Sequence, residues 1–436
     1  MRLTIHRGTR EIGGSCVELA SGATRIVLDL GMPLPGPKKT NITKESPLSP
    51  SDLIASGLLP NIRGLYAWDN PGVDAVFLSH AHRDHYGLAG FIHPRIPVYL
   101  SAGTRALMEL NEIFMAEPPV LSEKRLLADR ERLEVGDFAI TPYLVDHSAP
   151  DAMALLVEAG GKRLFYSGDL RGHGRKRGSF ERILHNPPRN IDCLLLEGTA
   201  LGRSQGVEES RPDFPDEQSV EEELVSLLSA KTNLALMLCS SQNLDRLVSA
   251  YRAVLRTNSL MVIDLYTAFV LQALSPLSPR LPQYHWRGMR IKYWKNHAEK
   301  LAGSGHQDFL YAANKHKIKM PELIARRAEI LMLTRSAGLF PLITRSLPDY
   351  NGLKIVWSMW RGYLTGEEPV SKFCRKNNLE INFVHTSGHA PLKDLKRLAE
   401  ALQPHKTIPI HTGFPHLYRD FFPNVHCLED GEELSI

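Results

Sequence analysis

The chain is poor in cysteine, in long apolar runs and in net charge. Its 436 residues include 5 cysteines, and no two of them form a C-x-x-C pair. This spacing argues against a disulfide framework and against a cysteine-based zinc site, and it predicts buried free thiols in a reducing compartment. The sequence also lacks any run of about 18 apolar residues, so we expect no segment that crosses a membrane.

The N-terminus, MRLTIHRGTREIGG, is polar where a signal peptide would need an apolar core. We therefore expect a cytoplasmic protein. The formal net charge of +4 is too small to indicate a partner by itself. Residues 171–178 and 289–330 are nevertheless rich in Lys and Arg. Ordinary surface helices and loops usually account for such runs, but a polyanionic substrate would also explain them.

The length predicts about two domains, and the first 200 residues are typical of a mixed α/β sandwich. A hairpin is expected where two strands flank the SG turn at 21–22. Residues 32–72, rich in Pro, Ser and Lys, predict a long loop. A helix is expected over 103–116. Strands are expected over 3–8, 16–20, 25–31, 74–79, 138–146, 153–158, 163–167 and 191–196.

The texture changes after residue 200. Residues 201–218 are turn-rich and acidic, which is typical of a linker. Helix and strand patterns then alternate, and this alternation predicts a parallel sheet with crossover helices. The tail is expected to add a helix, a strand and a closing hairpin that turns at 429–432. The resulting division is a first domain over 1–200, an insert over 201–383 and a return segment over 384–436.

Nine residues, SHAHRDHYG at 79–87, contain three histidines and an aspartate directly after a predicted buried strand. Imidazole and carboxylate ligands suit Zn²⁺, Mn²⁺ or Fe²⁺. His80 and His82 are two apart in an extended segment, so they point the same way and can share one ion. Asp84 and His85 follow where the chain turns and can face a second ion. A polar loop that happens to contain histidines is the alternative, but four ligand-type residues in six positions favour metal.

Two neighbouring ions need further ligands, and three candidates follow short apolar runs at predicted strand ends. They are His147 in YLVDHSAPDA, Asp169 in LFYSGDLRG and His411 in TIPIHTG. Each precedes a turn, which places it on the rim of a sheet. An Asp after Ser-Gly is usually only a turn residue. Beside the histidine cluster, Asp169 becomes a candidate bridging ligand.

These motifs together resemble a known family. SHAHRDH, DHSAPDA and YSGDL resemble the metallo-β-lactamase fold, and LDLGMP with Asp29 resembles the first motif of that family, an Asp that supports the metal loop without binding metal. LLLEGTA, the large insert, HTSGHAP and IPIHTG follow in the order of the β-CASP nucleases. The D-H-S-x-P-D-A stretch is similar to the ribonuclease J branch. The chain ends soon after His411, so we expect such a protein without the additional C-terminal domain of that branch.

The resemblance implies an α/β fold, a metallo-β-lactamase αββα sandwich with an inserted β-CASP α/β cap domain. It also implies two divalent metal ions, Zn²⁺ with Mn²⁺ as the alternative. One ion would be held by His80, His82 and His147, the other by Asp84, His85 and His411, with Asp169 bridging them. Three residues would have catalytic roles: Asp84 orients the nucleophile, His389 is the general acid and Glu197 holds its imidazole. The alternative for His389 is a loop histidine bonded to the backbone.

The function implied is a metal-dependent ribonuclease that hydrolyses phosphodiester bonds of single-stranded RNA, by an endo or a 5′-exo mode. On the family pattern, a histidine at position 411 favours RNA over DNA. Phosphate contacts are expected from Arg171, Arg175 and Lys176. Three alternatives stay open: a single-stranded DNA nuclease, a small-molecule hydrolase acting on a lactone or thioester, and an inactive nucleic-acid-binding subunit. Formation of a homodimer also stays open.

Overall fold

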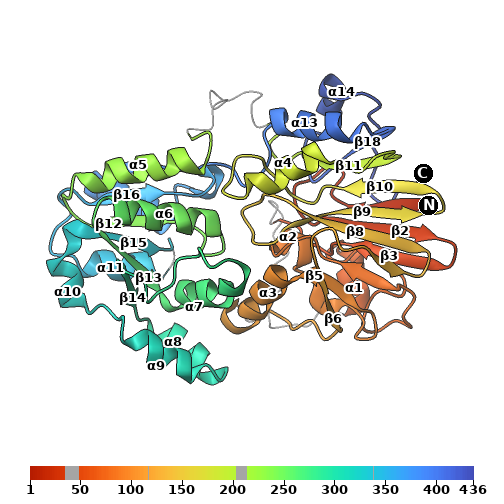
Figure 1. The fold of residues 1–436 in the computed structure, drawn as a ribbon. Helices are drawn as coiled ribbons and strands as arrows, with labels where there is room; N and C mark the ends of the chain where they lie inside the picture. Colours follow the sequence, from red (N-terminus) through yellow and green to blue (C-terminus); the bar gives the residue numbers. More distant parts are fainter. Residues whose placement is uncertain (35–48, 116, 203–213, 337) are drawn as a thin grey trace.

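A computed structural model of the chain describes residues 1–34, 49–115, 117–202, 214–336 and 338–436. Most of the predicted linker 201–218 and part of the predicted loop 32–72 lie outside these ranges. Within them the strands form three sheets. Two sheets pack face to face, and the third forms a separate unit beside them, drawn in green and cyan in Figure 1. All five cysteines are free, and only Cys427 is partly exposed.

The first sheet has the strand order β19-β1-β2-β3-β4-β5-β6. The predicted hairpin is confirmed, because β2 and β3 pair antiparallel with Ser21 opposite Thr24. The predicted closing hairpin at 429–432 is wrong. The Gly431 amide donates to the Ile5 carbonyl, and the last strand pairs with β1 instead of folding back on its predecessor. The strands are β1 (Arg2–Arg7), β2 (Cys16–Ser21), β3 (Thr24–Leu28), β4 (Ala75–Phe77), β5 (Val98–Ser101), β6 (Lys124–Leu127) and β19 (Glu433–Ser435).

The second sheet has the order β18-β11-β10-β9-β8-β7. Its inner face and that of the first sheet share one apolar core, in which Leu28, Phe77 and Leu195 are fully buried. Strand β11 lies between β10 and β18 and runs parallel to both. The strands are β7 (Leu133–Val135), β8 (Phe138–Leu144), β9 (Met153–Ala159), β10 (Lys162–Tyr166), β11 (Cys193–Glu197) and β18 (Lys406–Ile410).

Helices cover both outer faces, which completes four αββα layers. Helices α1 (Pro50–Ala55) and α3 (Ala102–Met115) pack on the first sheet. The second sheet is covered by α4 (Arg177–His185), α13 (Leu392–Leu402) and α14 (Tyr418–Phe421). Helix α1 lies within the predicted loop. Its signal was local, because Ser49 and Asp52 form a capping box around Pro50 at the first helical position.

The third sheet has the order β14-β13-β15-β12-β16-β17, and all its pairs are parallel, as the alternation of helix and strand predicted. It lies within 201–383, although the division into three segments stays a prediction. Its strands are β12 (Ala235–Leu238), β13 (Leu260–Asp264), β14 (Met289–Lys292), β15 (Ile330–Thr334), β16 (Lys354–Trp357) and β17 (Ile381–Phe383). Its helices are α5 (Glu217–Ser229), α6 (Leu244–Arg256), α7 (Leu265–Ala273), α8 (Lys295–Gly303), α9 (Gln307–Asn314), α10 (Met320–Ala325), α11 (Leu339–Ser346) and α12 (Pro369–Asn377).

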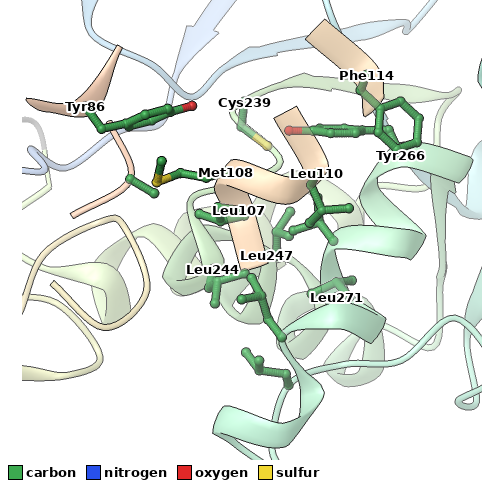
Figure 2. Packing of buried hydrophobic residues seen from close by; sticks show 14 of the residues in the cluster. Tyr86, Leu107, Met108, Leu110, Phe114, Cys239, Leu244, Leu247, Tyr266 and Leu271 are labelled. Carbon is green, nitrogen blue, oxygen red and sulfur yellow. The ribbon is translucent and has the colours of Figure 1, made fainter. Parts of the chain in front are cut away.

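The insert, meaning the described residues between 214 and 383, shares an apolar cluster with the sandwich. Figure 2 shows Leu107, Leu110 and Phe114 of α3 beside Leu247 of α6 and Tyr266 of α7. The rings of Phe114 and Tyr266 meet edge to face with centroids 4.8 Å apart. Because this contact is apolar and buried, it holds the insert against the sandwich at the side of α3.

Leu195 tests the core on which the strand ends depend. Replacing it with Ala leaves a cavity between the two sheets, because its side chain is fully buried. We expect Leu195→Ala to lower the free energy of unfolding by about 2–5 kcal/mol. Urea unfolding followed by circular dichroism measures this loss. Leu126→Ala is the control, since Leu126 is 56% exposed, and it should change stability by less than about 0.5 kcal/mol. Equal effects of the two substitutions would contradict this account of the core.

Candidate metal centre

Five strands of the sandwich end at one edge, and a predicted site residue lies at or just after each end. His80 follows β4, His147 follows β8, Asp169 follows β10, Glu197 ends β11 and His411 follows β18. Strands β10, β11 and β18 are parallel, so their carboxyl ends meet at the same edge. Ligand sites form at this edge in α/β sheets because loops there are free to converge.

The short helix α2 (Arg83–Tyr86) brings Asp84 and His85 to the same edge. Its approach is close, because a Cβ at Gly31 would lie 1.8 Å from the Asp84 carbonyl oxygen. Only glycine fits at that position. His82 caps the helix in an extended conformation and stays on the side of His80.

The predicted site residues converge in three overlapping groups, each with ligand atoms within 4.8 Å of one another. Asp169 belongs to two groups and His411 to two. The groups are His80, His82, His147 and Asp169; Asp84, His85 and His411; and Asp169, Glu197, His389 and His411. The structure therefore brings all seven predicted ligands together with Glu197 and His389.

The carboxylate of Asp169 lies at the centre of these groups. Its Oδ2 is 3.3 Å from His85 Nε2, 3.7 Å from His80 Nε2 and 3.9 Å from His147 Nε2. Its Oδ1 is 3.5 Å from His411 Nδ1. Both oxygens are buried and have no hydrogen-bond partner among the described residues. Buried polar atoms without partners need an explanation, and nitrogen and oxygen donors in this arrangement fit divalent cations.

The imidazoles of the first group are held neutral. Burial lowers the pKa of His80 and His147 well below its usual value and that of His82 to about 4. Neutral imidazole is the form that binds a metal. Nδ1 of His82 lies 3.0 Å from Nε2 of both His80 and His147, so three nitrogens face one point.

Burial also opposes charge on His85, but the Asp169 and Asp29 carboxylates outweigh it and raise the pKa of His85 well above its usual value. Desolvation by burial would raise the pKa of Asp169, and the surrounding His411, His85 and His389 lower it well below the ordinary range. The carboxylate is therefore ionised. The negative charge of Asp169 lies at the centre of the site, where it would stabilise a bound cation.

Asp29 supports the centre from behind. Its Oδ1 accepts from the Ser79 amide at 2.7 Å, and its Oδ2 accepts from Ser79 Oγ at 2.7 Å, His85 Nδ1 at 2.8 Å and Tyr166 Oη at 2.6 Å. The residue adopts the left-handed region, with φ 58°. The bond to Nδ1 fixes the His85 ring so that Nε2 faces Asp169. Such outer contacts orient metal ligands and tune their affinity.

Glu197 and His389 form a second pair at the edge of the centre. Nδ1 of His389 lies 3.4 Å from Glu197 Oε1 and 3.5 Å from Asp169 Oδ2. Glu197 is fully buried and also accepts from the amides of Leu170 and Thr199. The His389 side chain is 20% exposed, whereas those of His80 and His147 have no exposed surface. His389 therefore meets both solvent and the centre.

Three residues that hold the site had not been predicted in that role. Thr199 Oγ1 lies 2.7 Å from Nδ1 of His411, and Ser79 and Tyr166 donate to Asp29. Each lies inside a motif already recognised, at SHAH, YSGDL and LEGT. Their positions at the strand ends were the available signal.

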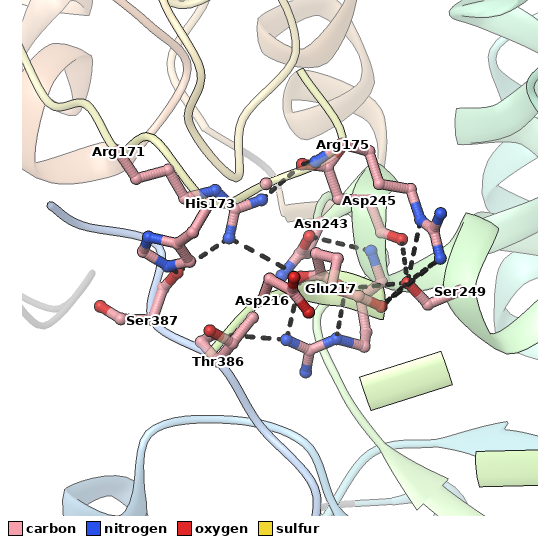
Figure 3. A network of polar contacts seen from close by, with 12 residues as sticks. Arg171, His173, Arg175, Asp216, Glu217, Asn243, Asp245, Ser249, Thr386 and Ser387 are labelled. Atoms are coloured by element: carbon pink, nitrogen blue, oxygen red, sulfur yellow. Dashed lines mark hydrogen bonds and ion pairs between the residues drawn. The ribbon is translucent and has the colours of Figure 1, made fainter. Parts of the chain in front are cut away.

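The structure does not bring the predicted phosphate contacts to the centre. Arg171 has no exposed surface and pairs with Asp146 and Asp245. Arg175 bonds to Glu221 and Ser249, and Lys176 Nζ lies 2.8 Å from Asp245 Oδ1. Figure 3 shows Arg171, Arg175, Asp245 and Ser249 within this internal polar network. Carboxylates of α5 and α6 pair with all three basic side chains, and the buried Arg171 cannot reach a phosphate.

Comparison with known proteins agrees with this geometry. Residues 51–222 match the family model described as "Beta-lactamase superfamily domain", and residues 376–419 match the one described as "Zn-dependent metallo-hydrolase RNA specificity domain". The chain therefore contains a domain of the β-lactamase superfamily. The predicted fold class, a sandwich of this superfamily with an inserted α/β cap, is confirmed.

Curated relatives include ribonucleases. Ribonuclease J of Sinorhizobium meliloti is 26% identical over 240 residues, which are 52% of this chain and 38% of that protein. Ribonuclease TTHA0252 of Thermus thermophilus is 30% identical over 216 residues, 46% of this chain and 44% of that protein. The chain thus spans less than half the length of either relative.

A solved structure of a protein of unknown function from Enterococcus faecalis V583 covers 99% of both chains with a TM-score of 0.75 and 21% identity. This likeness concerns the fold. None of the helices within the described ranges has the length and apolar character needed to cross a bilayer.

Asp29 provides a test of the metal centre that does not depend on activity. Asp29→Asn keeps the shape of the side chain but loses the charge that orients His85. We expect metal affinity to fall by about 10–100-fold. Competition with a chromophoric chelator, with metal counted by mass spectrometry, measures this change.

The matched control is Asp74→Asn, because Asp74 Oδ2 accepts an exposed bond from the Arg25 amide far from the centre. It should bind metal as the unchanged protein does. Unaltered metal affinity in Asp29→Asn would contradict the supporting role of Asp29.

Proposed function

We propose that the protein is a metal-dependent ribonuclease that hydrolyses phosphodiester bonds in single-stranded RNA. The observation that carries the proposal is the convergence of six other ligand-type residues around the buried carboxylate of Asp169, whose oxygens have no hydrogen-bond partner among the described residues. The names of the relatives and the RNA specificity description of residues 376–419 support RNA as the substrate.

The ligand roles follow the grouping of the side chains. His80, His82 and His147 would hold one divalent ion, and Asp84, His85 and His411 a second, with Asp169 shared between them. Zn²⁺ or Mn²⁺ suits this set of imidazole and carboxylate donors. A pair of such ions would lower the pKa of a water molecule and stabilise charge on the phosphate.

The chain's own residues complete the reaction. Asp84 lies at the centre with His411 Nε2 3.3 Å from its Oδ2, where it can orient the attacking water. The leaving oxygen needs a proton, and the partly exposed His389 is placed to donate it. Glu197 Oε1, 3.4 Å from His389 Nδ1, holds the ring in place.

Cleavage of matched 5′-labelled RNA and single-stranded DNA, with Zn²⁺ or Mn²⁺, tests the proposal. We expect RNA cleavage that a chelator abolishes. His82→Ala should remove most activity together with bound metal. His389→Ala should keep its metal and lower kcat by about 10²–10⁴-fold, because only proton donation is lost.

His405→Ala is the control, since the His405 side chain is 75% exposed. His405 lies just before β18, at the end of the strand opposite to His411. It should cut RNA normally. Cleavage of DNA alone would favour the DNA nuclease, and hydrolysis of a lactone or thioester without cleavage of either polymer would favour the small-molecule enzyme. Normal cleavage by both His82→Ala and His389→Ala would exclude the assigned site.

A further inference from the structure

The guanidinium of Arg171 lies two residues beyond Asp169 and contacts both parts of the molecule. Its Nε lies 3.4 Å from Oδ1 of Asp146, the residue before His147. On the insert side its Nη2 bonds to Asp245 of α6, and its Nη1 lies 3.7 Å from Glu217 Oε1 of α5. The side chain is fully buried. A buried cation with three carboxylate neighbours fixes the relative position of the elements that carry them.

The same guanidinium reaches the loop that carries His389. Nη1 of Arg171 donates to the Ser387 carbonyl at 2.8 Å, and His173 Nε2 lies 2.9 Å from the same oxygen. The hydroxyl of Ser387 in turn accepts from the His389 amide at 3.0 Å. A continuous chain of contacts therefore runs from α6 through Arg171 and Ser387 to His389, as Figure 3 shows for its first members.

A second buried arginine binds the residue just before Ser387 in the same loop. Arg246 of α6 pairs with Glu217 and donates to the Thr386 carbonyl at 3.3 Å. Both arginines have no exposed surface, so water does not compete for these bonds. Two successive carbonyls before His389 are thus bound by side chains anchored in the insert helices.

We propose that Arg171 is a positioning residue that couples the seating of the insert to the placement of the proton donor His389. This inference rests on the proposed function. The loop residues 384–391 form no strand or helix, so their geometry depends on such side-chain contacts. A small displacement of the His389 imidazole from the leaving oxygen would slow only the step in which that oxygen takes its proton.

Lysine cannot replace Arg171 in this role. The guanidinium directs separate nitrogens toward Asp146, Asp245 and Ser387, while an ammonium on a flexible stem is a single point charge. Arg171→Lys therefore keeps the charge that the buried carboxylates require but releases the Ser387 carbonyl. This makes it a gentler change than removal of the cation.

The experiment compares two substrates on the metal-loaded protein. RNA has an alkoxide leaving group that needs a proton, whereas a p-nitrophenyl phosphodiester releases a phenolate that does not. We expect Arg171→Lys to lower kcat on RNA about tenfold or more, with KM and metal content little changed. The rate on the p-nitrophenyl ester should stay within about twofold of the unchanged protein. His389→Ala should show the same selectivity to a greater degree.

His173→Ala provides a second variant in case Arg171→Lys folds poorly, because it removes the other contact to the Ser387 carbonyl. It should show the same preference for the ester with a smaller loss on RNA. Arg256→Lys is the matched control. Arg256 links α6 to α5 through ion pairs with Glu221 and Glu222, away from the loop 384–391. The rates on RNA and on the p-nitrophenyl ester should therefore both be retained.

An equal loss on both substrates, a rise in KM alone, or no loss in either variant would overturn the positioning role. The proposed function fails differently, since the unchanged protein would then cut no RNA with either metal. Normal RNA cleavage by the unchanged protein with non-selective effects of Arg171→Lys and His173→Ala would leave the ribonuclease standing and remove only this inference.

Discussion

Five imidazoles surround the carboxylate of Asp169 within 4 Å. The carboxylate is buried, and its oxygens have no hydrogen-bond partner among the described residues. Moving an ion out of water costs several kcal/mol unless other charges compensate. The rest of the centre is organised around this cost. Burial keeps His80, His82 and His147 neutral, and the Asp169 and Asp29 carboxylates raise the pKa of His85. His389 and His411 each lie 3.5 Å from an oxygen of Asp169.

The site has inner side chains, which could bind metal, and outer side chains, which hold the inner ones in place. Most inner residues lie at the strand ends, where hydrogen bonding between strands holds the backbone, whereas Asp84 and His85 lie on α2. Outer residues such as Asp29 and Thr199 fix the rings of His85 and His411 through single hydrogen bonds. The loop of His389 has no strand of its own, and its carbonyls are instead bound by arginines whose partners belong to the insert. The position of that loop therefore depends on tertiary contacts with the insert.

Local patterns predicted the inner residues, and the resemblance predicted Asp29, whereas the supporting roles of Ser79, Tyr166 and Thr199 were not predicted. A short apolar run followed by His or Asp identifies a strand end, so His147, Asp169 and His411 could be placed on one rim without knowledge of the fold. The basic stretch at 171–178 had no such local signal, because the carboxylates that neutralise it lie on α5 and α6, far along the chain. The last strand was also mispredicted, since its partner β1 lies at the opposite end of the sequence. Sequence reading fails where the deciding contact is distant.

The apolar cluster between α3 and the helices α6 and α7 has a consequence for how the protein behaves as a whole. Removing the insert or the sandwich would expose the apolar surface of the other to water, so neither is expected to be stable by itself. Unfolding of one part strips the other of its cover, and the two are expected to melt in a single cooperative transition. Mutational damage deep in the insert would then be felt as reduced abundance of the entire chain, even where every residue of the centre is intact.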